Sequence, residues 1–196
     1  MKLKKAAMFG LDARIALAIF GALSVISGAA LYSAIQNAKV TALQTEFSEA
    51  QKAWEAYYLD TGVVPPRHSG DVSFFDASYL VEDNSVTGWK GPYLPFVKDS
   101  STTYRLKHNN YYQLIYVNAL SSNAWGEGGD NWSAHKCLQG VDNCYSWVMI
   151  IGSKDLSLVQ ELDKRYDGTV SATEGNFRYY QSGGDYRMML KNILYK

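Results

Sequence analysis

The N-terminal part of the sequence contains a long run without a charged residue, from Ile15 to Ala38. At about 1.5 Å per residue, a helix over this run would be about 36 Å long, which is enough to cross the hydrocarbon core of a bilayer. Lys2, Lys4 and Lys5 precede the run, and a basic segment before an apolar one is typical of export or membrane insertion. We therefore expect this part of the chain to enter a membrane.

The helical pattern continues where the apolar run ends. Between Gln36 and Asp60 there is no Gly or Pro, and good helix formers dominate. Apolar residues recur there at intervals of three and four, which places them on one helical face: Leu43, Phe47, Ala50, Trp54, and Tyr57 with Tyr58. We predict one helix from about residue 12 to residue 60, apolar all round and then amphipathic. Thr61-Gly62 ends it, and Pro65-Pro66 prevents its continuation.

The rest of the chain must supply the surface on which the amphipathic half packs. Two β-hairpins are predicted, one from Thr102–His108 and Tyr111–Val117 around Asn109-Asn110, the other from Phe177–Gln181 and Tyr186–Leu194 around Gly183-Gly184-Asp185. Ser146–Ile151 is predicted as a buried strand. Lys154–Tyr166 is predicted as a short helix with an apolar face of Leu156, Val159 and Leu162. Residues 61–100 and 119–145 are expected to be irregular. The fold class is α+β, with a long N-terminal helix packed on an antiparallel sheet.

Cys137 and Cys144 lie in the second irregular segment. A closely spaced pair in an exported chain favours a disulfide, which would stabilise the fold by roughly 2.5 kcal/mol in the chain-entropy model. Two reduced, buried thiols are the alternative. The spacing is not that of a C-x-x-C pair, so neither redox chemistry nor zinc binding is expected.

The leader and the helix together resemble a known family. A short Lys-rich segment ends in Gly10, and the apolar helix follows from Leu11. This arrangement resembles the class III signal of type IV pilins and of the pseudopilins of type II secretion. The resemblance implies a leader over residues 1–10, a helix over 11–60 and a globular head over 61–196. It implies cleavage after Gly10 by a prepilin peptidase and methylation of the new amino group on Leu11.

The resemblance also implies a life cycle. The subunit waits in the inner membrane with its head outside the cytoplasm. An assembly ATPase and an inner-membrane platform then add it to a filament of copies of itself and minor pilins. The filament is extracellular in a pilus and periplasmic in a pseudopilus.

One residue departs from the family pattern. The family usually has Glu at the fifth mature position, where it neutralises the amine of a neighbouring subunit, and this chain has Ile15. Our hypothesis is that Asp12, in the first helical turn, takes over that pairing. The alternatives are local pairing of Asp12 with Arg14, or a minor tip subunit that needs no such Glu. Gly21 and Gly28 favour either close helix approach or, by resemblance, local melting of the helix on assembly.

Two further motifs carry the resemblance into the head. Gly88 to Leu94, G-W-K-G-P-Y-L, is similar to a run in major pseudopilins. Leu158 to Gly168 followed by Gly175 to Tyr179 is similar to a pattern of type IVb-like pilins. The first motif favours a pseudopilin of type II secretion. The second motif and the cysteine loop favour a pilin for adhesion, motility or DNA uptake, which we prefer.

No catalytic or metal-binding motif is recognisable in the sequence. It contains no G-x-S-x-G, H-E-x-x-H or P-loop. Of the three histidines, His135 is near Cys137 but has no second ligand pair at zinc spacing. Asp163, Asp167 and Glu174 offer oxygen ligands for calcium, although three such carboxylates are more often solvated. We expect no enzyme activity, cofactor or metal.

The net charge is zero, so nucleic-acid binding is not indicated. A functional alternative of another class remains: a single-pass, membrane-anchored extracytoplasmic binding module.

Overall fold

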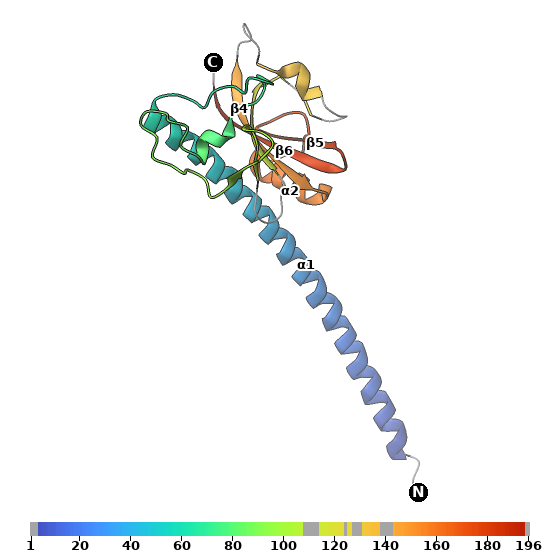
Figure 1. The fold of residues 1–196 in the computed structure, drawn as a ribbon. Coiled ribbons are helices and arrows are strands. Elements are labelled where there is room, and N and C mark those ends of the chain that lie inside the picture. The colour runs from blue at the N-terminus through green and yellow to red at the C-terminus, as the bar shows by residue number, and fades with distance from the viewer. Residues whose placement is uncertain (1–3, 108–113, 124, 127–130, 138–142, 195–196) are drawn as a thin grey trace. The chain divides into compact units, whose positions relative to one another are not determined.

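The computed structural model describes residues 4–107, 114–123, 125–126, 131–137 and 143–194 (Figure 1). The chain forms two compact units, Met1–Thr41 and Ala42–Lys196. A single α-helix, α1 (Lys4–Thr61), runs through the first unit and into the second. The predicted long helix is therefore confirmed, and it begins before residue 12. Gly62 has a φ of 72° and donates its N–H to the Tyr58 carbonyl at 2.8 Å, which is a left-handed helix end.

The second unit is built on one antiparallel sheet. Its order is β1-β2-β3-β4-β6-β5. The strands are β1 (Val97–Lys98), β2 (Leu106–Lys107), β3 (Leu114–Ser121), β4 (Cys144–Ser153), β5 (Phe177–Ser182) and β6 (Asp185–Leu194). Every neighbouring pair is antiparallel. The α+β fold with a long helix packed on an antiparallel sheet is confirmed.

One face of the sheet packs against helices. The second half of α1 and the shorter helix α2 (Leu156–Asp167) cover it. Phe47 of α1 contacts Phe177 of β5 and Tyr166 of α2 edge to face, at centroid distances of 5.9 and 6.2 Å. Gln51 donates from Nε2 to the Lys191 carbonyl at 3.1 Å. The predicted α1 face is buried from Leu43 to Tyr57, but Tyr58 is exposed, which corrects its inclusion.

The opposite face carries a second core that is rich in aromatic residues. It consists of Phe74, Tyr116, Leu120, Trp125, Trp132, Trp147, Met149, Ile151, Tyr180 and Met189. Strand alternation explains the division, because Met188 and Leu190 face the helices while Met189 faces this aromatic core. The sheet thus separates two hydrophobic layers, and each strand residue belongs to one of them.

The predicted C-terminal hairpin is confirmed. β5 and β6 pair from Phe177↔Leu190 to Ser182↔Asp185, and Gly183 and Gly184 make the turn with φ of 63° and 87°. β5 is an edge strand, as its position after the polar loop predicts. Ser146–Ile151 lies inside β4, which confirms the buried strand.

The segment 119–145 was wrongly predicted to be irregular throughout. β3 continues to Ser121 and β4 begins at Cys144, and Leu120↔Tyr145 and Ser121↔Cys144 are paired. A 3-10 helix, η2 (Asn131–His135), lies between them. Polar residues obscured the strand ends in the sequence, although Ala119 and Leu120 are fully buried. The Cys137–Cys144 disulfide is confirmed, with Cα atoms 5.8 Å apart.

The first predicted hairpin is confirmed only in part. β2 and β3 are antiparallel, but β2 is limited to Leu106–Lys107, and the Asn109-Asn110 turn lies outside the described residues. The chain before β2 turns instead, because the Asp99 carboxylate accepts the N–H of Ser101 at 2.9 Å. Residues 61–100, expected to be irregular, contain β1 and the 3-10 helix η1 (Ala77–Leu80).

α2 begins at Leu156, close to the predicted Lys154. Asp155 is its N-cap and accepts the N–H groups of Ser157 and Leu158. Leu156 was predicted to lie on the apolar face, but it is exposed and Leu158 is buried in its place. Leu156 is the first residue of α2, and the buried face consists of Leu158, Val159, Leu162 and Asp163.

We expect Phe47→Ala to lower the free energy of unfolding of the head by about 3–5 kcal/mol. The variant loses a large buried ring that packs against Tyr166 and Phe177. Leu59→Ala is the control, since Leu59 is on the same helix and 81% exposed. Urea unfolding of the full chain in neutral detergent measures both. Equal losses for the two variants would contradict the packing of α1 on the sheet.

Candidate functional site

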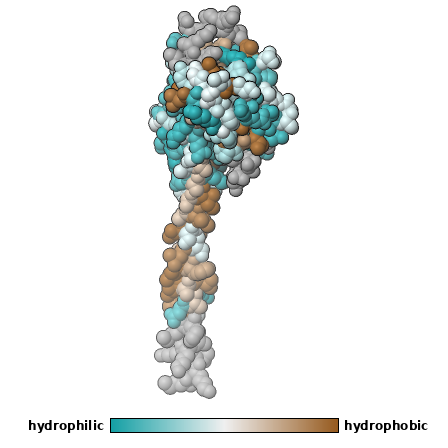
Figure 2. All heavy atoms as spheres, turned by 60° about the vertical axis from the view of Figure 1, so that its left-hand side comes forward, coloured by the Kyte–Doolittle hydropathy of each residue, from teal (hydrophilic) through white to brown (hydrophobic). Residues whose placement is uncertain are grey.

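The first unit exposes many large apolar side chains. Eleven large apolar side chains between Leu11 and Ile35 are 46–73% exposed: Leu11, Ile15, Leu17, Ile19, Phe20, Leu23, Val25, Ile26, Leu31, Tyr32 and Ile35. Figure 2 shows this part of α1 as a predominantly hydrophobic surface. Among the described residues, one helix, Gly10–Thr61, contains a window long and apolar enough to cross a membrane, and none of that window is buried. We call residues 11–35 the apolar segment.

The sequence-predicted processing and assembly residues all lie on α1. Gly10, Leu11, Asp12 and Arg14 are exposed, and within the described chain no ion pair joins Asp12 to Arg14. A Cβ atom added at Gly21 or Gly28 would have no neighbour within 4 Å. The assignments of these residues stay predictions.

The G-W-K-G-P-Y-L run docks on the C-terminal end of α1. The Asp60 carboxylate accepts hydrogen bonds from Lys90 at 2.8 Å and from the Tyr93 hydroxyl at 3.0 Å. The hydrogen bond from Lys90 is the main cause of the lowered pKa of Asp60. Trp89 donates from its indole to the Tyr79 carbonyl at 2.9 Å. Trp89 and Tyr93 therefore anchor this loop.

Gly88 is required by this docking. Its φ is 89°, and a Cβ atom there would lie 2.3 Å from the Asp60 carbonyl oxygen. Any side chain at this position would push the loop off the end of α1. The glycine of the motif thus has a structural function independent of any partner.

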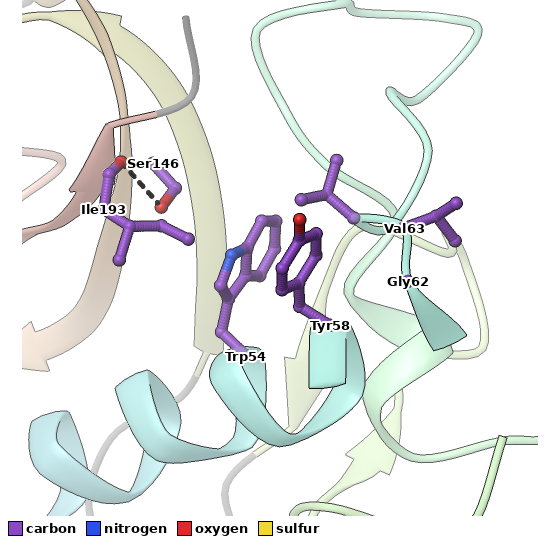
Figure 3. A pocket seen from close by; sticks show the side chains of 7 residues that line it. Trp54, Tyr58, Gly62, Val63, Ser146 and Ile193 are labelled. Carbon is purple, nitrogen blue, oxygen red and sulfur yellow. Dashed lines mark hydrogen bonds between the residues drawn. The ribbon is translucent and has the colours of Figure 1, made fainter. Parts of the chain in front are cut away.

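A groove of about 520 Å³ lies beside the same end of α1 (Figure 3). Its lining residues are Trp54, Tyr58, Gly62, Val63, Val64, Ser146 and Ile193. Figure 3 shows Trp54 and Tyr58 projecting from α1, with Ser146 and Ile193 across from them. The lining contains no charged residue and no histidine, so it offers apolar contact and no acid–base chemistry.

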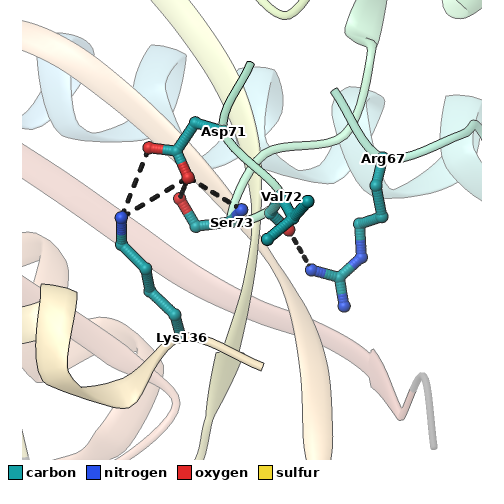
Figure 4. Close-up of polar contacts among 5 residues, drawn as sticks. All are labelled: Arg67, Asp71, Val72, Ser73 and Lys136. Atoms are coloured by element: carbon teal, nitrogen blue, oxygen red, sulfur yellow. Dashed lines mark hydrogen bonds and ion pairs between the residues drawn. The ribbon is translucent and has the colours of Figure 1, made fainter. Parts of the chain in front are cut away.

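The chain around the disulfide is held by charged side chains (Figure 4). The Asp71 carboxylate accepts the N–H and hydroxyl of Ser73 at 3.0 and 2.6 Å and lies 3.3 Å from the Lys136 ammonium. Arg67 donates to the Val72 carbonyl and, at 3.3 Å, to the Cys137 carbonyl. These contacts fasten the segment 67–73 to the residues that precede the disulfide loop.

Arg178 is a structural centre that the sequence analysis did not find. It is buried, and its guanidinium lies 4.8 and 4.9 Å from the ring centroids of Trp125 and Trp147. It also donates to the carbonyls of Asn123 and Ser122. Burial lowers the pKa of Arg178 to about 10, so it remains charged at neutral pH. The only feature of the sequence that could have indicated this role is the position of Arg178 between two aromatic residues in an edge strand.

The residues considered for calcium are used by the chain itself. Asp167 accepts the N–H groups of Asn176 and Phe177 at 3.0 and 2.8 Å, and Asp163 accepts that of Ser171 at 2.7 Å. A Cβ atom at Gly175, whose φ is 88°, would lie 2.3 Å from an Asp167 oxygen. These carboxylates fix the loop between α2 and β5. In the described parts of the chain, no group of three or more His, Cys, Asp or Glu residues is placed to hold a metal ion.

His68 lies in a small polar cluster with Asp76 and Thr103. Its Nδ1 is 2.7 Å from Asp76 Oδ1, and Thr103 donates its hydroxyl to the same oxygen at 2.6 Å. In a Ser-His-Asp relay the nucleophile and the carboxylate lie on opposite ring nitrogens. Here both the hydroxyl and the carboxylate are next to Nδ1, so the geometry is not that of a relay. Of the other histidines, His135 lies in η2 and His108 outside the described residues.

Comparison with known families adds one finding. Residues 34–127 match the model described as PilW, C-terminal, of a type IV pilus biogenesis family. The match links this chain to type IV pilus biogenesis. It covers just under half of the chain, from the end of the apolar run through β3, and it includes the loop docked on Asp60. No curated protein and no solved structure matches the chain. With the apolar helix, this link indicates a membrane anchor in the cell envelope.

The pH dependence of stability tests the buried Asp163. Its Oδ1 has no hydrogen-bond partner in the described structure, and burial raises its pKa from 3.8 to about 6. A raised carboxyl pKa means that the folded state holds the proton more tightly, so this group stabilises the fold as the pH falls from above 6 toward 4. We expect a gain of at most about 3 kcal/mol.

Asp163→Asn should be more stable than the natural chain at pH 7.5 and should lose this part of the pH dependence. Urea midpoints of the full chain in neutral detergent at pH 7.5 and 4.5 measure the effect. Glu55→Gln, at an exposed position of α1, is the control. If the urea midpoint of the natural chain changes between the two pH values by the same amount as that of Asp163→Asn, the buried ionisation is excluded.

Proposed function

We propose that this chain is a structural subunit of a type IV pilus-like filament and has no enzymatic activity. The observation that carries the proposal is the apolar segment, a helix that is uncharged from Ile15 onward and exposes eleven large apolar side chains. Such a surface is stable in a bilayer or among similar helices, and each fully buried Leu, Ile or Phe contributes about 1.5–3 kcal/mol. The similarity to a type IV pilus biogenesis family supports a bundle of similar helices, and not the bilayer, as the place where this helix functions.

The proposed mechanism is a transfer between two apolar surroundings. The chain waits in the inner membrane with its head outside the cytoplasm, and a prepilin peptidase removes residues 1–10. An assembly ATPase and its inner-membrane platform move the helix from lipid into a bundle formed with copies of itself and minor pilins. Adhesion, motility or DNA uptake would follow from the extracellular filament.

A pseudopilin of type II secretion is the second candidate. The observation in its favour is the docking of the G-W-K-G-P-Y-L run on Asp60, because this motif is similar to one in major pseudopilins. An accessory or anchored binding module is a third possibility, in which the same segment only holds the head at the membrane. Processing and filament incorporation separate these roles.

We expect the chain from cells that contain prepilin peptidase to begin at methylated Leu11, and the chain from cells without the enzyme to begin at Met1. Intact-mass measurement of the purified protein gives the answer. Gly10→Val should block cleavage, whereas Gly21→Ala, farther along the same helix, should leave it unchanged. A chain that keeps its leader beside active peptidase would contradict the proposal. So would a chain cut near the small residues Ser27-Gly28-Ala29, as after an ordinary signal peptide.

We expect Asp12→Ala to reduce the amount of this chain in sheared filaments by roughly tenfold, because a charge pair with a neighbouring amine is worth about 1–2 kcal/mol in a partly apolar setting. Glu55→Ala is the matched control on an exposed part of the same helix. Normal incorporation of the Asp12 variant would remove Asp12 from the pairing role and leave the filament proposal intact.

A further inference from the structure

Cationic side chains gather at one end of the sheet, on the face that carries the aromatic core. Arg105 directly precedes β2, and Tyr116 lies on the adjacent strand β3. Lys107 of β2 and Arg187 of β6 project from the same face, where Arg187 pairs with Ile151 and Tyr180. The Tyr116 hydroxyl is near enough to Arg105 and Arg187 to interact with both charges. We call Arg105, Lys107, Tyr116, Tyr180 and Arg187 the cationic cluster.

Arg187 has few partners for its charge. Its Nη1 donates to the Tyr180 hydroxyl at 3.3 Å, and its guanidinium carbon lies 5.6 Å from the centre of that ring. Its Nε is buried and has no hydrogen-bond acceptor in the described structure. Asp185 is two residues earlier on the same strand face, yet in the described chain no ion pair connects it to Arg187. Among the described residues, this half-buried guanidinium therefore has no carboxylate partner.

Arg105 and Lys107 share a single carboxylate. Asp99 lies 3.6 Å from Arg105 and 3.9 Å from Lys107, and both contacts are longer than direct hydrogen bonds. The same Asp99 side chain already accepts the N–H and the hydroxyl of Ser101 at 2.9 Å each. The Arg105 Nε is the atom that faces Asp99 Oδ2 at 3.6 Å, too far for a hydrogen bond, and the Arg105 Nη2 donates to the Ser101 hydroxyl at 2.6 Å. Arg105 and Lys107 thus share one carboxylate, and Oδ1 of that carboxylate already accepts both hydrogen bonds of its own turn.

We propose that Arg105, Arg187 and the Tyr116 hydroxyl form a binding site for an oxyanion group, a carboxylate or a phosphate, with Lys107 at its rim. Guanidinium groups present their N–H donors in a planar fork that matches both anions. Buried donors are normally paired, so the Arg187 Nε, which has no hydrogen-bond partner among the described residues, indicates a missing acceptor. The aromatic floor formed by Tyr104, Tyr116 and Tyr180 limits water around the anion and strengthens the attraction. The site does not depend on the proposed function.

Arg178 does not belong to the site, although it lies on the same face. Its Nε, like that of Arg187, has no hydrogen-bond partner among the described residues, but both of its terminal nitrogens donate to carbonyl oxygens and two indole rings cover its faces. Its charge is used within the fold, whereas Lys107 is 49% exposed and Arg105 is 27% exposed through their side chains. The accessible part of the positive charge is therefore the cationic cluster.

The test follows arginine Nε–H resonances of the full-length, ¹⁵N-labelled chain in neutral detergent at pH 6.5. Sodium phosphate and, separately, sodium acetate are added at an ionic strength held constant with sodium chloride. We expect saturable shifts of the Arg105 and Arg187 resonances with a dissociation constant of roughly millimolar order, as a few charge-assisted hydrogen bonds provide. Saturation by phosphate alone defines a phosphate site, and saturation by both anions defines a general oxyanion site.

Matched variants make the result specific. Arg187→Gln should weaken binding at least about tenfold, because a hydrogen bond to a charged group is lost. Lys164→Gln, an equal charge change on α2 across the sheet, should have no effect. If Arg187→Gln loses its folded spectrum, Lys107→Gln serves instead and should weaken binding about twofold. Chemical shifts that grow linearly with the concentration of both anions would overturn the proposal. An equal loss of affinity in Lys164→Gln would also overturn it.

Discussion

The fate of the apolar segment governs the rest of this molecule. Eleven large apolar side chains on one helix cannot remain in water, because each contributes about 1.5–3 kcal/mol on burial. A helix satisfies its own backbone hydrogen bonds, so it can be stored in lipid at little cost. The same property lets it move into a bundle of similar helices, where close packing replaces contact with lipid. No covalent change is needed in either state.

In the head, a small antiparallel sheet is packed between two apolar layers. One layer is conventional, with α1 and α2 on the first face. The other layer is covered by loops, and charged side chains fix those loops: Arg178 between two indoles, and Asp71 beside Lys136. Loops fixed in this way leave a cationic cluster open at one end of the same face. The head thus combines a rigid frame with a surface able to take a partner.

Much of this architecture follows from periodicity alone. The 3.6-residue pattern from Leu43 to Tyr57, the Gly183-Gly184 turn and the paired cysteines each fix a feature locally, and each is confirmed. The errors arose where the decisive contact is distant in sequence. Ser121 and Cys144 are strand residues because they pair with each other, and no local pattern reveals that. Leu156 is a separate case: it is the first residue of α2 and is exposed, whereas the buried face begins at Leu158. The environment of Arg178 and the cationic cluster could not be predicted, since each combines side chains from separate strands and loops.

The central claim is that the apolar segment ends among other filament subunits, and photo-cross-linking tests it most directly. A benzophenone amino acid at position 20, in place of the exposed Phe20, is activated in cells that carry a working assembly machine. The same residue at position 59, in the head, reports contacts outside the helix bundle. The account predicts that position 20 forms covalent adducts with other subunits in the sheared filament fraction, and only lipid adducts when assembly is blocked. Lipid adducts alone, with the chain confined to the membrane while filaments form, would contradict it and favour an anchored accessory protein.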